Sequence, residues 1–218
     1  MLLLVPTIGE ARVLVEPPFP VDEQPVRTRV ADRDVWAALC GFGPVAAGVM
    51  ASRALGLCDV PEVVLAGIAG TLAPGVLGVG SVLCPSSVRM VDLGRGRGEE
   101  TVGPAALGLP QVAGAGAREA IYDVLTLSQR PPGGTMAGEL LCVPAAAGSP
   151  QEAAERAKRH PGALAEDMEG FAVALAARLA GRRLTILRGI SNVAGEVDHT
   201  SWEVERALAA VRDLLGPQ

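Results

Sequence analysis

Three polar residues stand where predicted strands end, and their chemical types could together support the cleavage of a bond. Glu10 follows the short apolar segment Leu2–Pro6. Glu169 begins a long apolar segment, and Asn192 follows the apolar segment Leu184–Leu187. Open α/β sheets bind their ligands at such strand ends. Two carboxylates and one amide there suit a polar ligand with hydroxyl groups and a heteroaromatic ring, although each residue taken singly could be an ordinary turn or helix-start residue.

The surroundings of Glu169 are unusual for an acidic residue. Glu166, Asp167 and Glu169 stand near the start of the segment Ala165–Gly181, which is otherwise almost entirely apolar. Acids favour a helix N-terminus because its free N–H groups carry roughly half a unit of positive charge. That effect explains one or two of the three acids. It does not explain an acid with apolar neighbours on both sides, so a chemical role for Glu169 is expected.

The length and composition limit the class of protein. The chain has 218 residues, and we expect a single domain over residues 1–218, because α/β folds of this size often remain undivided. A net charge of −5 without a basic run argues against a nucleic-acid partner, since such proteins carry a clustered positive surface. The opening segment predicts a strand and not a signal peptide. No apolar run reaches the roughly 18 to 20 residues that cross a membrane, so we expect a cytoplasmic protein without membrane contact.

The four cysteines are widely separated and have mostly apolar neighbours. They are Cys40, Cys58, Cys84 and Cys142, and no two of them form a CxxC pair. This pattern predicts buried free thiols in a reducing compartment and gives no support for zinc.

Apolar segments separated by turn residues predict an alternation of strands and helices. Strands are expected at Leu2–Pro6, Val26–Val30, Val35–Cys40, Glu62–Ala66, Ser81–Cys84, Ser87–Val91, Leu140–Val143 and Leu184–Arg188, the second and third forming a hairpin. Helices are expected over Pro44–Leu55, Ala115–Leu127 and Met168–Ala180, after Ser149 and after Thr200. The alternation predicts a three-layer α/β/α fold with a mixed, partly parallel central sheet.

Helix ends carry recognisable signals. In Ser149–Glu152, serine is the expected N-cap, proline the first helical residue and glutamate the third. Gly181 is expected at the C′ position that ends the long apolar helix. Thr200 and Glu203 predict a second capping box at the start of the last helix.

Three glycine-rich segments have different interpretations. Gly67–Gly70 is expected to be a turn after a central strand, where backbone N–H groups can approach a ligand. Gly94–Gly98 is expected to be a solvated loop. Gly41–Ala46 fits the G-x-G-x-x-A dinucleotide pattern. However, the next strand, Glu62–Ala66, is followed by glycine where a dinucleotide site needs an acid. A tight strand-to-helix turn is therefore the preferred interpretation of the Gly41–Ala46 segment.

Five segments in order carry a family resemblance over nearly the whole chain. They are Pro6–Glu10, Gly41–Ala47, Val64–Gly70, Glu166–Glu169 and Arg188–Asn192. Together they resemble the nucleoside phosphorylase/hydrolase superfamily, especially the nucleosidases that cleave methylthioadenosine and adenosylhomocysteine. Met168–Ala174 with Arg188–Gly195 looks most like the futalosine hydrolases, which release hypoxanthine from futalosine in a route to menaquinone. The resemblance implies an N-glycosyl hydrolase with a small nucleoside substrate.

The resemblance also implies residue roles. Glu10 would orient and deprotonate the attacking water. Glu169 would accept hydrogen bonds from ribose hydroxyls and favour a sugar that becomes cationic, and Met168 would pack on the ribose. Such cleavage builds positive charge on the sugar and negative charge on the departing purine, so it needs these groups. Side chains can handle both water and leaving group, so no metal or organic cofactor is implied. The expected substrate-binding set is completed by Ala69, Gly70, Phe42 and Trp202.

Asn192 is the residue that would decide between bases. Adenine-specific relatives carry aspartate here, which can protonate N7 and accept from the 6-amino group. Asparagine cannot act as a general acid, but its NH₂ can donate toward N7 or O6 and its carbonyl can accept from a protonated nitrogen. That set suits a 6-oxopurine, so hypoxanthine is expected in preference to adenine.

The chain departs from the family pattern in the pocket. Ile68 stands where the adenosine-type relatives have serine, and no basic residue precedes Asp198 to bind a carboxylate on the substrate tail. Arg188, His199 and the Arg95/Arg97 loop are the remaining candidates for that contact. His199 alone could equally be a helix-cap residue, and Trp202 could pack in the core.

Two alternatives stay open. A purine nucleoside phosphorylase would need a phosphate cradle after the first strand, and the charge of Glu10 there would repel phosphate; water is the favoured nucleophile. A non-catalytic purine-nucleoside-binding protein could share the fold, although Glu10, Glu169 and Asn192 argue for catalysis. Relatives form dimers or larger rings, so a homo-oligomer is expected. Phe42 and the predicted helix Pro44–Leu55 could contribute to its interface.

Overall fold

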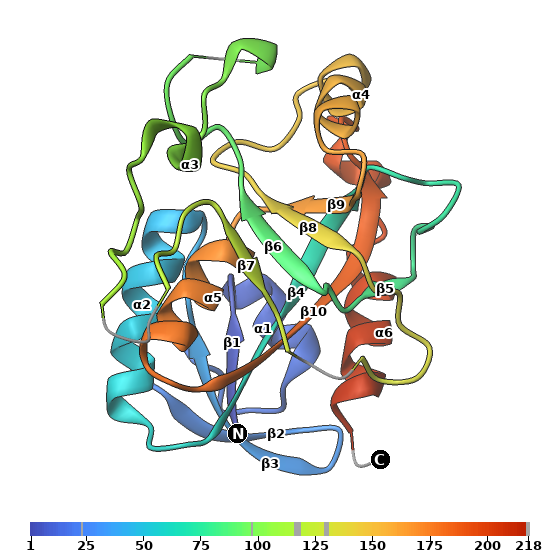
Figure 1. Cartoon of the computed structure of the whole chain (residues 1–218). Coiled ribbons are helices and arrows are strands. Elements are labelled where there is room, and N and C mark those ends of the chain that lie inside the picture. The colour runs from blue at the N-terminus through green and yellow to red at the C-terminus, as the bar shows by residue number, and fades with distance from the viewer. Residues whose placement is uncertain (23, 97, 116–118, 129–130, 217–218) are drawn as a thin grey trace.

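A computed structural model describes residues 1–22, 24–96, 98–115, 119–128 and 131–216. Within these ranges ten strands form one mixed sheet (Figure 1). The strands are β1 (Leu2–Val5), β2 (Val26–Val30), β3 (Arg33–Leu39), β4 (Glu62–Thr71), β5 (Val82–Leu83), β6 (Ser87–Met90), β7 (Val124–Thr126), β8 (Glu139–Cys142), β9 (Ala163–Asp167) and β10 (Arg183–Val193). The expected hairpin is confirmed, because β2 and β3 pair in antiparallel fashion.

The sheet brings the carboxyl ends of its central strands to one edge. The strand order is β2-β3-β1-β4-β9-β8-β6-β7, and β10 branches from β4. Strand β1 runs parallel to both β3 and β4, and β10 runs parallel to β4 along nearly its whole length. Ligands of open α/β sheets bind at this edge.

Helices cover both faces of the sheet and confirm the three-layer α/β/α fold. On one face lie α2 (Pro44–Leu57) and α5 (Gly170–Leu179), side by side in Figure 1. On the other face lie α1 (Ile8–Leu14) and α6 (Val204–Leu215). Two short helices, α3 (Pro104–Leu107) and α4 (Pro150–Arg159), lie outside these layers. Across the described ranges, no helix has the length and apolarity that a membrane span requires.

Small side chains allow α2 and α5 to approach each other closely. Ala47, Ala51 and Ala54 of α2 are buried, as are Ala174 and Ala177 of α5. Burial of these faces against the strands forms one apolar core, and α1 with α6 forms a second core on the opposite face. Apolar burial of this kind is the dominant favourable contribution to folding.

Two predicted helix ends are confirmed, and one is wrong. Ser149 accepts a hydrogen bond from the backbone N–H of Glu152 at 3.2 Å and caps α4. Gly181, with φ of +65°, follows the C-cap residue Ala180 of the long helix and so stands at the C′ position. The predicted capping box of Thr200 with Glu203 does not form. The Thr200 hydroxyl instead donates to Asp198 at 2.7 Å, within a short 3₁₀ turn that precedes α6.

The glycine-rich segment Gly67–Gly70 is strand and not turn, so that prediction is wrong. It lies within β4 and pairs with β10 as far as Thr71 and Val193, with one shift of register between Ile190 and Asn192. Long-range pairing with β10 outweighs the weak strand preference of glycine. Because Gly67 has no side chain, the charged side chains of Arg188 and Glu10 can lie against this part of β4.

The predicted helix Ala115–Leu127 is also wrong. Residues 116–118 lie outside the described residues, and the remainder contains β7 and a bridge between Val112 and Ile121. Strand β7 pairs in antiparallel fashion with β6. A strand partner far away in the sequence therefore decides the structure of this segment, and local spacing cannot reveal that partner.

Candidate active site

Glu10 lies in the first turn of α1, a short helix that the sequence did not predict. Thr7 is the N-cap, and a capping box joins it to Glu10. Oε2 of Glu10 accepts from the Thr7 backbone N–H at 3.1 Å and from the Thr7 hydroxyl at 2.7 Å. Oε1 accepts from the backbone N–H of Ile68 at 3.0 Å. The carboxylate is 6% exposed, and these three donors leave it one acceptor direction, on Oε1.

Glu169 is the N-cap residue of α5, and both of its oxygens are bonded. Oε1 accepts from the backbone N–H of Gly43 at 3.0 Å, and Oε2 accepts from Arg188 at 2.9 Å. Gly41 and Gly43 have φ of +81° and +84°, a conformation that favours glycine. The Gly41–Ala46 segment is thus a tight turn whose backbone binds an internal carboxylate.

Arg188 joins the two carboxylates. Its side chain is fully buried on β10 and donates through Nε and Nη2 to Asp167, and through Nη2 to Glu169. Nη1 has no hydrogen-bond partner among the described residues. A Cβ on the neighbouring Gly67 would lie 2.2 Å from Nη1 of Arg188 and 2.7 Å from Oε1 of Glu10. Glycine is therefore required at this position. We call Glu10, Asp167, Glu169 and Arg188 the Arg188 cluster.

The balance of charge in the cluster perturbs its carboxylates. Three acids surround one arginine. Burial raises the pKa of Glu169 to about 7, and the charges of Asp167 and Glu10 also raise it, against the opposing effects of Arg188 and the Gly43 N–H. Burial raises the pKa of the Cys40 thiol, and the charges of Glu169 and Glu10 also raise it, against the opposing effect of Arg188. A carboxylate that retains negative charge at such a site can stabilise a cation.

Asn192 lies at the carboxyl end of β10, beside Gly70 of β4. Its Oδ1 accepts from the Ser191 hydroxyl at 2.8 Å, and its Nδ2 donates to the Val193 carbonyl at 3.0 Å. One N–H and one lone pair of the amide remain for a ligand.

Only some of the other predicted site residues lie next to Asn192 or Glu169. Ala69 and Gly70 lie on β4 next to Asn192. Met168 precedes Glu169 and packs against a small buried cluster that includes Leu141. Phe42 is 70% exposed, and Trp202 is half-buried, donating to the Glu196 carbonyl and packing edge-on to His199 at 4.5 Å. Arg188, a predicted candidate for the substrate tail, is instead committed to internal carboxylates.

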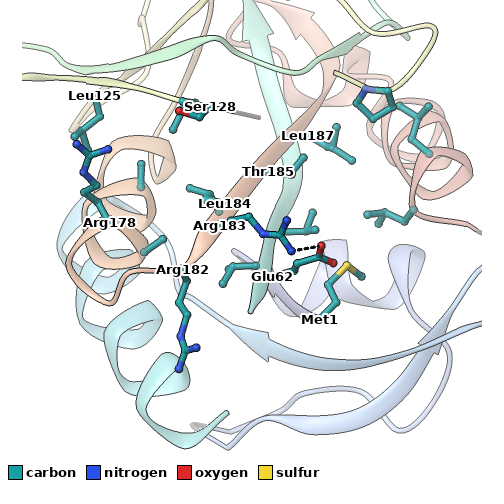
Figure 2. Close-up of a pocket in the computed structure, with 18 of the residues that line it drawn as sticks. Met1, Glu62, Leu125, Ser128, Arg178, Arg182, Arg183, Leu184, Thr185 and Leu187 are labelled. Atoms are coloured by element: carbon teal, nitrogen blue, oxygen red, sulfur yellow. Dashed lines mark hydrogen bonds and ion pairs between the residues drawn. The ribbon is translucent and has the colours of Figure 1, made fainter. Parts of the chain in front are cut away.

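Two cavities lie away from these residues. One of about 540 Å³ lies near the amino ends of β4 and β10, with Arg178, Arg182 and the Arg183–Glu62 ion pair around it (Figure 2). Another, of about 370 Å³, lies beside Arg89 and His160. Neither is lined by Glu10, Glu169 or Asn192, which are 6%, 5% and 9% exposed. The candidate site is therefore nearly closed to solvent. Over the described residues, no group of three or more His, Cys, Asp or Glu could hold a metal ion.

Sequence reasoning missed the role of Asp167. It was assigned with Glu166 to the helix start, but both lie in β9. Asp167 accepts from the backbone N–H of Gly170 at 2.9 Å, so it does face the helix N-terminus, and it also binds Arg188. A buried arginine following an apolar strand is a signal that could have suggested a carboxylate partner, but not which one.

The chain belongs to the Phosphorylase superfamily, which it matches over residues 9–215. It is 34% identical over 154 residues to a futalosine hydrolase of Streptomyces coelicolor, an alignment that covers 71% of this chain and 63% of that relative. A second futalosine hydrolase, from Acidothermus cellulolyticus, is 34% identical over 147 residues, which cover 67% of this chain and 59% of that relative. The chain thus spans less than two thirds of the length of each.

A solved structure shares the fold. The 5′-methylthioadenosine/S-adenosylhomocysteine nucleosidase of Neisseria meningitidis, in complex with methylthio-immucillin-A, superposes with a TM-score of 0.74 at 20% identity, over 98% of this chain and 95% of that one. At this identity the likeness shows the fold alone.

Proposed function

We propose that this chain hydrolyses the N-glycosidic bond of futalosine, releases hypoxanthine, and so serves the futalosine route to menaquinone. The observation that carries the proposal is the Arg188 cluster. It places the carboxylates of Glu10 and Glu169 on either side of one buried guanidinium, at the edge of the sheet where Asn192 also lies. Similarity to two futalosine hydrolases supports this substrate.

Glu10 activates the attacking water. The remaining lone pair on its Oε1 accepts a hydrogen bond from that water and takes its proton as the water attacks. Nη1 of Arg188 lies on the same side of Gly67 as this oxygen and orients the water oxygen. A positioned base contributes about 10² to 10⁴ to the rate of such a step. Ile68 contributes its backbone N–H to Glu10 but has no hydroxyl to help fix the water, so Glu10 and Arg188 hold that water.

Glu169 binds the ribose. Each of its oxygens keeps one lone pair after bonding Gly43 and Arg188, and two ribose hydroxyls can donate to them. As the C–N bond breaks, the ring becomes cationic and the surplus negative charge of the Arg188 cluster stabilises it. A fixed charge in a nearly dry site acts more strongly than in water. Met168 packs against the sugar.

Asn192 receives the departing purine. Its remaining N–H donates toward N7 or O6, and its remaining lone pair accepts from a ring N–H, as a 6-oxopurine offers. An unmatched buried donor or acceptor costs about 1–3 kcal/mol, which favours hypoxanthine over adenine. Ala69 and Gly70 give the base a flat backbone surface, and Phe42 and Trp202 wall the substrate tail.

A base-release assay tests the proposal. Purified protein is incubated with futalosine, inosine or methylthioadenosine, with and without phosphate, and the free base is measured by chromatography. We expect hypoxanthine from futalosine at the same rate with and without phosphate. Ribose 1-phosphate formed only with phosphate would instead indicate a phosphorylase. Faster release of adenine than of hypoxanthine would contradict the base assignment, and tight binding without release would indicate a binding protein.

The proposed assembly is a homo-oligomer in the cytoplasm. Phe42, Val45 and Val49 are 70%, 80% and 63% exposed at helical spacing on and before α2. Such an apolar stripe suits contact with a second copy of the chain. Four buried cysteines, all free, suit a reducing compartment.

A further inference from the structure

A second buried ion pair lies outside the Arg188 cluster. Arg156 of α4 and Glu166 of β9 are 3% and 4% exposed, and Nη1 of Arg156 donates to Oε2 of Glu166. A buried ion pair is weak evidence for stability, because removing two charges from water costs as much as their attraction returns. The pair therefore needs an explanation other than stability.

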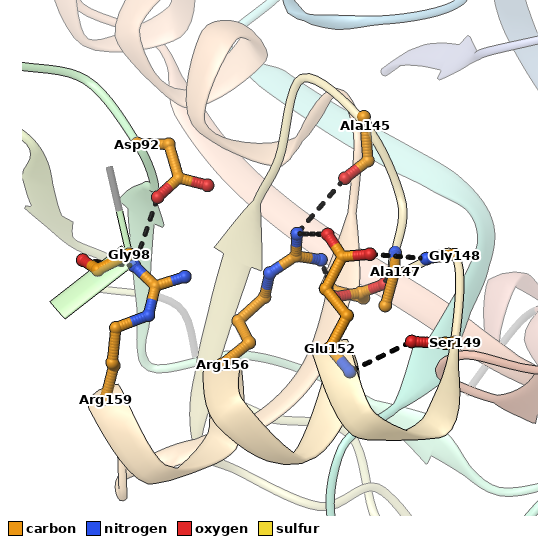
Figure 3. A network of polar contacts seen from close by, with 10 residues as sticks. Asp92, Gly98, Ala145, Ala147, Gly148, Ser149, Glu152, Arg156 and Arg159 are labelled. Atoms are coloured by element: carbon orange, nitrogen blue, oxygen red, sulfur yellow. Dashed lines mark hydrogen bonds and ion pairs between the residues drawn. The ribbon is translucent and has the colours of Figure 1, made fainter. Parts of the chain in front are cut away.

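The ion pair fixes the loop formed by residues 144–149, between β8 and α4. Oε1 of Glu166 accepts from the backbone N–H of Ala147 at 2.8 Å. Nη2 of Arg156 donates to the carbonyl of Ala145 at 3.4 Å (Figure 3). Each charged residue thus holds one backbone group of the loop in addition to its partner.

Glu152 extends the same network from the first turn of α4. Its Oε1 accepts from Arg156 at 3.2 Å and its Oε2 accepts from the backbone N–H of Gly148 at 2.9 Å, while its own N–H donates to Ser149 (Figure 3). We call Arg156, Glu166 and Glu152 the Arg156 clamp. Together they hold four of the six residues of the loop, so its backbone has little freedom.

The clamped loop rests on the chain that follows Asn192. Ala147 packs against Ala194 in a small apolar cluster. A Cβ on Gly195 would lie 2.4 Å from the carbonyl oxygen of Ser149, so loop and strand exit are in close backbone contact. The position of Asn192 is therefore linked to the position of the loop through the next residues of the chain.

The register of the sheet gives a second link. Glu166 of β9 pairs with Gly70 of β4, and Gly70 pairs with Asn192 of β10. Paired residues project their side chains from the same face of a sheet. The pairing of β10 with β4 shifts between Ile190 and Asn192, yet a Cβ on Gly70 would lie 3.4 Å from Nδ2 of Asn192. Glu166 and Asn192 thus flank Gly70 on the same face, which is the face that the loop covers.

We propose that Arg156 and Glu166 are positioning residues, which hold loop 144–149 as a fixed wall beside Asn192 and thereby set the preference for a 6-oxopurine over a 6-aminopurine. This inference rests on the proposed function, because it takes Asn192 as the contact of the base. Neither residue touches the substrate. The clamp acts through the loop and through the strand exit at Ala194 and Gly195.

The test replaces both charges together. An Arg156→Met/Glu166→Met variant leaves no single charge buried, and such apolar replacements are often neutral for stability. We expect an unchanged melting temperature, faster amide hydrogen exchange at residues 145–149, and at least a tenfold fall in the ratio of hypoxanthine affinity to adenine affinity, measured by calorimetry. The ratio of kcat/KM for futalosine to kcat/KM for its 6-amino analogue falls in parallel.

Two further variants separate positioning from general damage. Arg156→Met/Glu166→Gln keeps an acceptor for the Ala147 N–H and restores part of the affinity ratio. Arg159→Met removes a cation from the same helix, but its Asp92 partner lies on the side of α4 away from loop 144–149 (Figure 3), so the ratio stays at the wild-type value. An unchanged ratio in a folded Arg156→Met/Glu166→Met variant overturns the proposal, as does unchanged amide exchange of the loop.

The readouts also separate this inference from the proposed function. If wild-type protein releases no base from futalosine, the hydrolase assignment fails, while the base affinities and the amide exchange still report on the clamp. If wild-type protein binds hypoxanthine and adenine equally, the selectivity inference fails even when futalosine is cleaved.

Discussion

The Arg188 cluster and the Arg156 clamp contain the same residue types but have different roles. In the clamp, each oxygen of Glu166 has its own donor, and the second acid, Glu152, is half-exposed. In the cluster, Arg188 is shared among three acids that are all buried, and the pKa of Glu169 is raised to about 7. One nitrogen of each arginine, Nε of Arg156 and Nη1 of Arg188, has no partner within the described residues, so the two regions differ in the number of buried acids. One buried acid matched by one arginine can hold backbone in place, whereas a surplus of buried carboxylates is available for chemistry.

The largest expected difference between the two regions is catalytic. Glu10→Gln removes the proposed general base while keeping the size of the side chain, and we expect kcat for hypoxanthine release to fall about a thousandfold. Hypoxanthine affinity should stay within about threefold, because the purine is not expected to contact Glu10. Glu166→Gln in the clamp is the matched control, with kcat changed less than about tenfold. Similar losses from both variants would remove the distinction between the regions.

Stability should also differ between the two arginines. Arg188→Met leaves three buried carboxylates without a cation, and breaking such an arrangement costs about 3–5 kcal/mol in the free energy of unfolding. Arg156→Met should cost less, because Glu166 keeps the Ala147 N–H and Glu152 can be solvated. Urea unfolding of both variants measures the difference, and an equal or larger loss for Arg156→Met would contradict the contrast.

The next largest expected effect is a change in base selectivity. Asn192→Asp introduces a titratable group that can protonate N7 and accept from a 6-amino group. We expect the ratio of kcat/KM for futalosine to that for its 6-amino analogue to fall roughly tenfold to a hundredfold. Competition assays with both nucleosides measure the ratio, and a ratio that rises in Asn192→Asp would refute the role of the amide.

The smallest effect is a pH dependence that only the Arg188 cluster should show. We propose that ionised Glu169 binds the ribose, so the rate of base release should rise with pH through about 7, and Glu169→Gln should not show this rise. The folded pKa is raised, so protonation of Glu169 stabilises the fold at low pH, and that stabilisation is lost as pH rises through about 7. Urea denaturation of the wild-type protein and of Glu169→Gln between pH 5 and 8 measures the free energy of unfolding. The same pH dependence in both proteins would rule out a contribution from Glu169.

Local sequence signals predicted what local interactions decide. The β2–β3 hairpin, the Ser149 cap and the helix end at Gly181 depend on residues close in sequence, and all three are confirmed. The strand character of Gly67–Gly70 depends on β10, more than a hundred residues away in the chain. Such pairing has no local signature, so these glycines were predicted to form a turn.

The features of the candidate site also divide into those that the sequence predicts and those that depend on distant contacts. The residue types of Glu10, Glu169 and Asn192, together with the family resemblance, indicated the chemistry that we propose for the site. The partners of Arg188 could not be predicted, because Asp167 approaches it only once β9 and β10 are placed by the sheet. The near closure of the site was not expected either, since burial of a charged cluster depends on packing from several elements.

The central claim is that surplus negative charge around Arg188 stabilises a sugar as it becomes cationic. The most direct measurement is the affinity of an iminoribitol that carries 9-deazahypoxanthine, a cationic mimic of that sugar, against its neutral carbocyclic analogue. We predict that the cation binds at least about a hundredfold more tightly, as transition-state mimics do. We further predict that Glu169→Gln removes most of this difference. Equal affinity of the cationic and neutral compounds for the wild-type protein would contradict the account.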